Sequence, residues 1–341
     1  MHRKRVRTII TAVLGLIVMV FVFAFLFPQF ANYQQAFSQL ETLNWWWVVA
    51  LLGVSALNIW VYPWTAKAAL PELHYGPAFV NRQAGFLISN VVPGGGAFAI
   101  GTQYAILARY RVPPGPAAAA VSADAVWTYL MTLGTPALAV VLLVIEGRST
   151  AGFLTIAIVG MVLVIVSVIA IAMVIRSQAG AERVGAFAQR LIAPIMRLFR
   201  RPEPNVQARV IDFADHAGVM VRTRWRQLTV TNVAAQLGPF LVLLVTIWAL
   251  GGFPNSVSLI EIFAAFSIAM LLVSFPITPG GLGTVDAALV ALLVAFGLDN
   301  ATAVAADLVW RLVWFLPQLL VGLGAFGWFT LQGRRTQRAI Q

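Results

Sequence analysis

Long apolar runs separated by short polar stretches extend along most of the chain. Six of them are about 20 residues or longer, which is the length that a helix needs to cross a bilayer. A membrane β-barrel would instead alternate apolar and polar residues over short segments. The pattern therefore predicts an all-α polytopic membrane protein with six full spans. The predicted spans are residues 7–27, 45–66, 116–145, 151–175, 227–250 and 301–331.

Two further apolar segments are interrupted near their middle. Residues 77–109 form two pieces of about 12 residues on either side of a Pro-Gly-Gly-Gly sequence at 93–96, and residues 258–297 are broken at 276–283. Each piece is too short to span a bilayer. Broken backbone at membrane depth is tolerated only where protein or a water-filled cavity surrounds it. The pattern therefore predicts two broken re-entrant hairpins besides the six spans.

Positive charge predicts the orientation, because cytoplasmic loops carry the excess of lysine and arginine. Basic residues precede the first span at positions 3–7 and follow the last at 334–338, so both termini are expected in the cytoplasm. Ten arginines lie in residues 176–226, where apolar residues recur at helical spacing. We expect one or two amphipathic helices there, on the inner membrane surface.

The two hairpins differ in charge at their ends. The hairpin at 77–109 carries Arg82 near its start and Arg109 at its end, so it is predicted to enter from the cytoplasm. The hairpin at 258–297 contains no lysine or arginine and is predicted to enter from outside.

An internal repeat relates the two halves of the chain. The sequence AAAVSADAVW at 118–127 shares seven of ten residues with ATAVAADLVW at 301–310, including an aspartate and a tryptophan. Each half reads as a span, a broken hairpin and a long span, and the hairpins have opposite predicted orientations. This predicts an inverted repeat, a design in which secondary transporters bind substrate at discontinuous helices near the midplane.

The whole chain is expected to form one membrane domain with five parts. These are a first span with an outer loop (1–44), the first repeat (45–145), a connecting span with the arginine-rich cytoplasmic segment (146–226), the second repeat (227–331) and a basic tail (332–341).

Composition excludes several function classes. The chain is 60% hydrophobic and 10% charged, which is typical of an integral membrane protein. It has no cysteine, and its three histidines are scattered, so we expect no thiol chemistry and no metal site. The net charge of +11 is interpreted as membrane topology, because no basic soluble domain is long enough to bind nucleic acid. No enzymatic motif is present, so no catalytic residue and no cofactor is expected.

Four charged residues lie at predicted membrane depth, where charge is costly and a functional role is the default hypothesis. They are Asp124, Asp286, Asp307 and Arg311. Asp307 and Arg311 share a helix face and either neutralise each other or contact a substrate or ion. Asp286 either stabilises the start of a helix, takes up a proton or cation, or pairs with Arg311. A guanidinium group suits a lipid phosphate because it binds phosphate bidentately.

The half-helices that follow the two breaks are predicted to begin near Ala97 and Thr284. Their N-termini carry unpaired amides and a partial positive charge, which favour an anion such as a lipid phosphate. The glycines would let a headgroup approach the backbone. Thr284 is the predicted N-cap, with Asp286 in the first turn. The predicted substrate-binding residues are Arg311, Asp286, Asp307, Asp124, Gly280, Gly281, Gly283, Thr284, Gly94, Gly95, Gly96 and Gln103.

The sequence PITPGGLGTVDAALVALLVAFGL, followed by DLVWRLVWFLPQLLVG, resembles the lysylphosphatidylglycerol synthase transmembrane-region family of flippase-like membrane proteins. The resemblance is most specific over residues 275–322. There are two departures, because Asp286 stands where the family usually has glutamate, and the first hairpin lacks the Arg and Glu that often follow its proline. The aminoacyl-transferase domain of bifunctional members is absent from this chain. The resemblance therefore implies movement of an anionic phospholipid or polyprenyl-linked lipid between leaflets, without lipid aminoacylation.

The sequence predicts a lipid translocase of the plasma (inner) membrane of a prokaryote, in which the headgroup passes through a midplane cavity between the repeats. Its partners would be membrane lipids, and a second copy of the chain or an enzyme of lipid or cell-envelope synthesis. One alternative is a membrane glycosyltransferase that uses polyprenyl-phosphate sugar donors, for which Asp299 and Glu261 are the visible acids. A non-transporting accessory subunit is a third interpretation.

Overall fold

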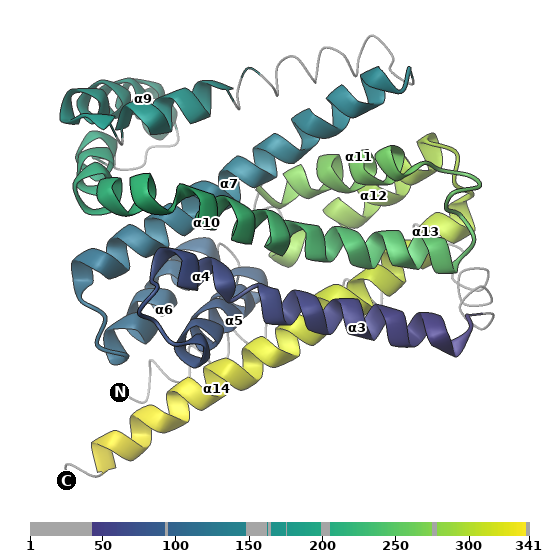
Figure 1. Cartoon of the computed structure of the whole chain (residues 1–341), viewed down its shortest axis with the longest axis horizontal. Helices are drawn as coiled ribbons and strands as arrows, with labels where there is room; N and C mark the ends of the chain where they lie inside the picture. Colours follow the sequence, from purple (N-terminus) through teal and green to yellow (C-terminus); the bar gives the residue numbers. More distant parts are fainter. Residues whose placement is uncertain are drawn as a thin grey trace.

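The structure is a computed structural model that describes residues 43–92, 95–147, 162, 165–174, 176–198, 205–274 and 278–338. Within these residues every regular element is a helix (Figure 1). The elements are α3 (Trp45–Val61), α4 (Trp64–Ala69), α5 (Tyr75–Val91), α6 (Gly95–Arg109), α7 (Pro114–Ile145), α9 (Gln178–Leu198), α10 (Val206–Ala249), α11 (Leu259–Met270), η3 (Leu271–Ser274), η4 (Pro279–Gly281), α12 (Thr284–Ala295), α13 (Asn300–Trp310), η5 (Arg311–Phe315) and α14 (Leu316–Arg338).

Four helical segments of the described chain are long and apolar enough to cross a membrane. Each corresponds to a span predicted from the sequence. The predicted span 7–27 lies outside the described residues, and of the predicted span 151–175 only residues 162 and 165–174 are described, as helix. By length and composition, the described residues fit a polytopic α-helical membrane protein. The four segments are Trp45–Ala69, Pro114–Ile145, Met220–Ala249 and Asn300–Leu331.

The arginine-rich stretch is helical as predicted, but its second half is not a separate surface helix. α9 packs along α10, and α10 continues without interruption from Val206 into the span that was predicted to begin near residue 227. Asn205 caps its start by accepting a hydrogen bond from the Ala208 amide at 3.0 Å. Residues 206–226 contain no proline to end the helix. The charge pattern predicts a membrane boundary near residue 227, but no helix boundary lies there.

Each predicted hairpin consists of two short helices that pack against each other, α5 with α6 and α11 with α12. The second break runs from η3 through η4 to Gly283. Gly280 and Gly283 have φ angles of +62° and +81°, which L side chains rarely adopt. Pro93 and Gly94 of the first break lie outside the described residues. The glycines of the second break therefore permit the chain to reverse between its two helices.

A long helix from each half of the chain packs against the hairpin of the other half (Figure 1). α14, from the second half, packs against α5 of the first hairpin, and α7, from the first half, packs against α11 of the second hairpin. α5 also packs against η4, and a Cβ placed on Gly280 would lie 3.4 Å from Asn90 Oδ1. The end of the first hairpin arm therefore meets the break of the second hairpin.

The largest buried apolar cluster surrounds the second hairpin and the helix that follows it. It includes Phe266, Leu289, Trp310 and Phe315. Trp310 is fully buried, and its Nε1 donates a hydrogen bond to the Pro239 carbonyl of α10 at 2.9 Å. This core holds the start of α12 and the turn η5 in fixed positions relative to each other.

Candidate functional site

A buried ion pair closes the break of the second hairpin. The Arg311 Nε donates a hydrogen bond to Asp286 Oδ1, and both residues are 2% exposed. The Gly283 amide donates to the other carboxylate oxygen of Asp286 at 2.5 Å. The Arg311 Nη atoms lie 3.4 and 3.5 Å from the carbonyl oxygens of Gly280 and Gly281. One carboxylate thus caps α12 and neutralises the guanidinium, while the glycine carbonyls help to hold the cation.

The structure corrects the predicted N-cap of this half-helix. Gly283 is the cap residue, and Thr284 is the first residue of α12. The Thr284 hydroxyl donates to the Gly281 carbonyl at 3.1 Å instead of accepting from the helix amides. A φ angle of +81° at the cap position explains why glycine stands there. Asp286, in the first turn as predicted, supplies the acceptor that the glycine lacks.

The predicted pairing of Asp307 with Arg311 along one helix face does not form. Asp307 is completely buried, and within the described residues neither of its carboxylate oxygens has a hydrogen-bond donor. Its charged neighbours are Asp286 and Arg311. Arg311 extends towards the start of α12 because a carboxylate and two carbonyl oxygens meet it there. Of the alternatives for Asp286, the structure shows two together, because its carboxylate both stabilises the start of α12 and pairs with Arg311.

The three residues Asp286, Asp307 and Arg311 form a cluster whose charges do not cancel. Two ionised carboxylates and one guanidinium leave one negative charge in an apolar core. An uncompensated buried charge is so costly that the group neutralises instead. The cluster is neutral when one of its two carboxyl groups holds a proton.

The backbone around Arg311 is irregular for a local reason. Residues Arg311–Phe315 form a π-helical turn, closed by the Leu316 amide donating to the Arg311 carbonyl. Pro317 has no amide hydrogen to offer the Val313 carbonyl, and Ser55 of α3 donates to that carbonyl instead, at 2.5 Å. Such turns are frequent at functional sites. The turn places the Arg311 guanidinium carbon 5.2 Å from the centre of the Phe315 ring.

The first half contains a second buried ion pair, which the sequence interpretation missed. Arg82 of α5 donates through Nη1 to Asp124 of α7, and both residues are buried. The Arg82 guanidinium also lies 4.3 Å from the centre of the Tyr62 ring. We had interpreted Arg82 as a marker of the cytoplasmic end of the hairpin. The available signal was that Asp124 needed a cation and that Arg82 is the only lysine or arginine in residues 77–108.

The lysylphosphatidylglycerol synthase TM region profile matches residues 12–322. The chain belongs to this family. The match confirms the resemblance, which covers essentially the whole chain and is most specific in residues 275–322. Membership of this family indicates that the chain is a multi-pass membrane protein related to lipid synthesis or flipping. A comparison with curated proteins finds no match.

The predicted substrate-binding residues of the second hairpin lie close together. Those of the first half lie at a separate place in the structure. Gly280, Gly281, Gly283 and Thr284 surround the Asp286–Arg311 pair, with Asp307 beside it. Asp124 and Gln103, by contrast, lie with Arg82 around a separate cavity of about 10 Å³. The two charge clusters of the molecule therefore belong to different halves.

The glycines of the first break have a structural explanation in this member of the family. A Cβ on Gly95 would lie 2.3 Å from the Ile88 carbonyl oxygen, so glycine there lets α6 pass close to the end of α5. Gly96 is exposed, with nothing within 4 Å of a Cβ, and Gly94 lies outside the described residues. The carbonyl of Gln103 accepts a hydrogen bond from Asn81 across the hairpin at 3.0 Å. The first hairpin thus uses its small and polar residues to pack against itself.

The two acids considered for a glycosyltransferase site are helix caps in this family member. Glu261 and Ser258 form a capping box at the start of α11, with bonds of 2.8 and 3.2 Å. Asp299 caps α13 by accepting from the Thr302 amide at 3.0 Å. Among the residues that the structure describes, no group of three His, Asp or Glu is placed to hold a metal ion.

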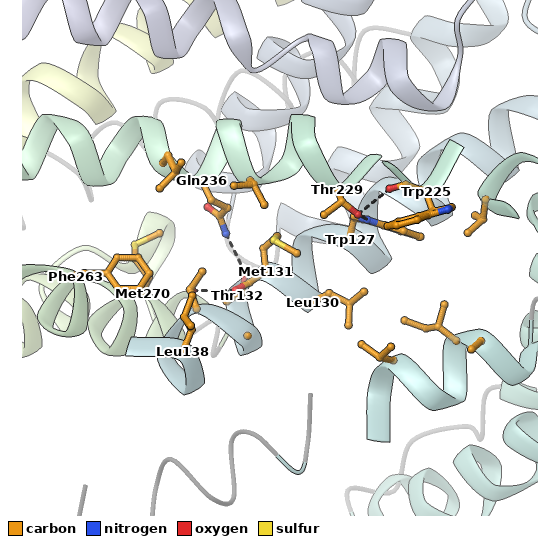
Figure 2. A pocket seen from close by; sticks show the side chains of 18 of the residues that line it. Trp127, Leu130, Met131, Thr132, Leu138, Trp225, Thr229, Gln236, Phe263 and Met270 are labelled. Atoms are coloured by element: carbon orange, nitrogen blue, oxygen red, sulfur yellow. Dashed lines mark hydrogen bonds between the residues drawn. The ribbon is translucent and has the colours of Figure 1, made fainter. Parts of the chain in front are cut away.

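A large cavity lies beside the hairpin site (Figure 2). Its volume is about 810 Å³, and it is bounded by α7, α10, α11 and residues 168–176. Trp127 donates to Thr229 at one part of the wall, and Phe263 and Met270 lie at the opposite part (Figure 2). Most of its lining side chains are apolar. Cavities of this size accommodate small organic ligands.

Proposed function

We propose that the chain is a lipid translocase whose second hairpin binds the anionic headgroup of a phospholipid or a polyprenyl-linked lipid. The observation that carries the proposal is the position of the Asp286 carboxylate between the Gly283 amide and Arg311. A helix N-terminus and a guanidinium are the two groups that proteins most often present to a phosphate. In the empty protein the carboxylate of Asp286 takes the place of that phosphate.

Substrate binding then requires an exchange of partners at Arg311. The phosphate displaces Asp286 from the guanidinium, so the carboxylate loses the cation that kept it ionised. Before binding, the cluster is neutral with Asp286 ionised and a proton on Asp307. After binding one monoanionic headgroup, it is neutral only with protons on both carboxyl groups. Each lipid bound at the cluster is therefore accompanied by the uptake of one proton, which provides a means of coupling transport to a proton gradient.

The two halves are proposed to act as an inverted repeat around this site. Support comes from the exchanged packing of α14 with α5 and of α7 with α11. It also comes from the matched tryptophans, because Trp127 and Trp310 both donate hydrogen bonds to α10, at Thr229 and Pro239. Rocking of one half against the other around a fixed site is the usual alternating-access motion of such repeats. Headgroup transfer through protein avoids the cost of moving charge through hydrocarbon.

The test is leaflet exchange of fluorescent phosphatidylglycerol in vesicles that contain the purified chain, scored by dithionite quenching. Wild type and the control Arg209→Gln, which removes an exposed arginine of α10, are expected to exchange lipid. Arg311→Gln is expected to abolish exchange because it removes the headgroup cation. In lightly buffered vesicles, exchange by wild type should also alter the internal pH.

Exchange at the wild-type rate by a folded Arg311→Gln protein would overturn the proposal. So would the absence of exchange by wild type with phosphatidylglycerol and with a polyprenyl-phosphate lipid, under pH gradients of both directions.

A further inference from the structure

The cavity of about 810 Å³ has charge at only one part of its lining. Arg176 and Arg222 are the charged side chains among its described lining residues, and no aspartate or glutamate is among them. Trp225 follows Arg222 by one helical turn and also lines the cavity. Arginine with tryptophan is the combination found where a membrane meets water. The lining therefore offers a cationic, interfacial end to an apolar interior.

The cavity extends along the membrane-spanning part of α10. Its α10 lining continues from Arg222 past Gln236, and these two residues are about 21 Å apart along the helix at 1.5 Å per residue. One leaflet of hydrocarbon is about 15 Å thick. Figure 2 shows the lining side chains of α7 and α10 following one another in the same direction, Trp127 beside Thr229 and Thr132 beside Gln236. The cavity is thus long enough to hold the chain of a lipid from one leaflet.

The cavity is accessible from the side of the protein. Leu138, Trp225 and Leu237 line it and are 49%, 51% and 40% exposed. In a membrane protein such exposed apolar side chains face lipid. Its inner wall lies close to the charge cluster, because the Phe266 ring is 6.1 Å from the ring of Trp310, the residue before Arg311. One layer of aromatic side chains therefore separates the cavity from the proposed headgroup site.

We infer that this cavity is a binding site for an anionic phospholipid of the leaflet at its arginine end. The phosphate contacts Arg176 and Arg222, and one acyl chain lies along the packed surface of α7 and α10 and faces the lining side chains of residues 168–176. The inference rests on the proposed function in that the bound lipid is the one supplied to the hairpin site. Charge complementarity commits the site to an anionic lipid, since arginines at the end of an apolar cavity match a phosphate that carries an acyl chain.

Lipid binding to this cavity can be measured without transport. The purified full chain in detergent is titrated with dioleoyl-phosphatidylglycerol or dioleoyl-phosphatidylcholine, and the complexes are counted by native mass spectrometry. Wild type should retain phosphatidylglycerol in preference to phosphatidylcholine. Arg176→Gln/Arg222→Gln should weaken phosphatidylglycerol binding by ~10-fold or more, because the loss of even one charge-assisted hydrogen bond corresponds to about a factor of ten. Arg190→Gln/Arg209→Gln removes two exposed arginines outside the cavity lining and is the matched control.

A second pair of variants fills the cavity without changing charge. Val233→Trp and Leu138→Trp place large side chains at partly exposed lining positions, where the fold can accommodate them. Both should weaken binding of both lipids, because they occupy the volume of the acyl chain. Equal phosphatidylglycerol binding by wild type and the Arg176→Gln/Arg222→Gln protein would overturn the inference. So would full binding by both tryptophan variants.

The outcomes separate this inference from the proposed function. Lipid binding that depends on Arg176 and Arg222, in a chain that exchanges no lipid, would support the cavity and overturn the translocase. Exchange that survives loss of cavity binding would support the translocase and overturn the supply of lipid from the cavity to the hairpin site. The chain has no cysteine, so a photoreactive maleimide on Leu138→Cys gives an independent readout. A cross-link to lipid is expected, and a cross-link to residues 7–27 of the same chain would overturn the inference by showing that protein fills the site.

Discussion

Three buried aspartates differ in the partner that surrounds their carboxyl group in the apolar interior. Asp124 pairs with Arg82, Asp286 pairs with Arg311, and Asp307 has no hydrogen-bond donor within the described chain. Asp124 and Asp307 stand at matched positions of the sequence repeat, yet only the first has an arginine bound to it. The repeat thus preserves the carboxyl group and changes its partner.

Replacing each of the two aspartates of the charge cluster by asparagine should change the stability of the protein by different amounts. Asp286→Asn removes the carboxylate that pairs with the buried Arg311 and leaves one oxygen to serve both Arg311 and the Gly283 amide, so a loss of about 3–5 kcal/mol is expected. Asp307→Asn removes no ion pair and should leave stability unchanged or raise it at neutral pH. Thermal unfolding of both proteins in detergent, followed by tryptophan fluorescence, measures the difference. Equal destabilisation by the two substitutions would contradict the assignment of Asp286 as the partner of Arg311.

The pair in the first half is predicted to be structural. Arg82→Met leaves Asp124 as an unpaired buried charge and should cost about 3–5 kcal/mol. Adding Asp124→Leu removes that charge and should recover most of the loss, because an apolar pair can replace a buried ion pair. The same fluorescence measurement, applied to the single and double variants, gives the coupling energy. A double variant no more stable than Arg82→Met would show that the two side chains act separately.

The positions of the helices could be predicted from the sequence, because long apolar runs and Pro-Gly breaks act within a few residues. The helices of the two predicted hairpins and the four described helical segments that are apolar enough to span lie where the sequence predicted them. The continuous α10 could not be predicted, since charge patterning reports the membrane surface and not the helix end. The Arg82–Asp124 pair was missed although the sequence offered a lone cation in residues 77–108, because its partners are 42 residues apart and meet only through packing of α5 against its neighbours. Asp286 and Arg311 were identified because their motif is local.

The close contact of α14 with α5 depends on a single glycine. A Cβ on Gly322 would lie 2.6 Å from the Gln83 carbonyl oxygen of α5, which is fixed backbone. Gly322→Ala should therefore force the two helices apart and destabilise the protein by about 1–3 kcal/mol. Gly324→Ala, two residues along the same helix, meets nothing within 4 Å and is the matched control. Thermal unfolding of the two variants measures the effect, and indistinguishable proteins would show that α14 and α5 are not held together at this point.

At the scale of the whole molecule, each half depends on the other for its hairpin contacts. α7 and α14 each support the hairpin of the opposite half, and α10 receives a tryptophan hydrogen bond from both halves. Such mutual support couples the halves, so that a rearrangement at one hairpin changes the surface on which the other rests. This is the arrangement that the proposed alternation of access requires.

The opposite entry of the two hairpins can be tested with single cysteines in the naturally cysteine-free chain. Glu72→Cys precedes α5 and Asn255→Cys precedes α11, and both positions are exposed. A membrane-impermeant maleimide should label Glu72→Cys only from the cytoplasmic side and Asn255→Cys only from the outer side, because charge predicts opposite orientations. Intact cells and inside-out vesicles provide the two conditions. Labelling of both positions from one side would contradict the inverted repeat.

The unbroken length of α10 has a mechanical consequence. Residues 206–226 form an arm of about 30 Å on the same rigid helix that carries the anchors for Trp127 and Trp310. A tilt of that arm is transmitted along the helix to the anchor at Thr229 and then to the anchor at Pro239, where the proline interrupts the helical hydrogen bonds. A force on this arm therefore acts on both halves of the molecule together. Such a force could come from α9, from a neighbouring protein or from lipid headgroups.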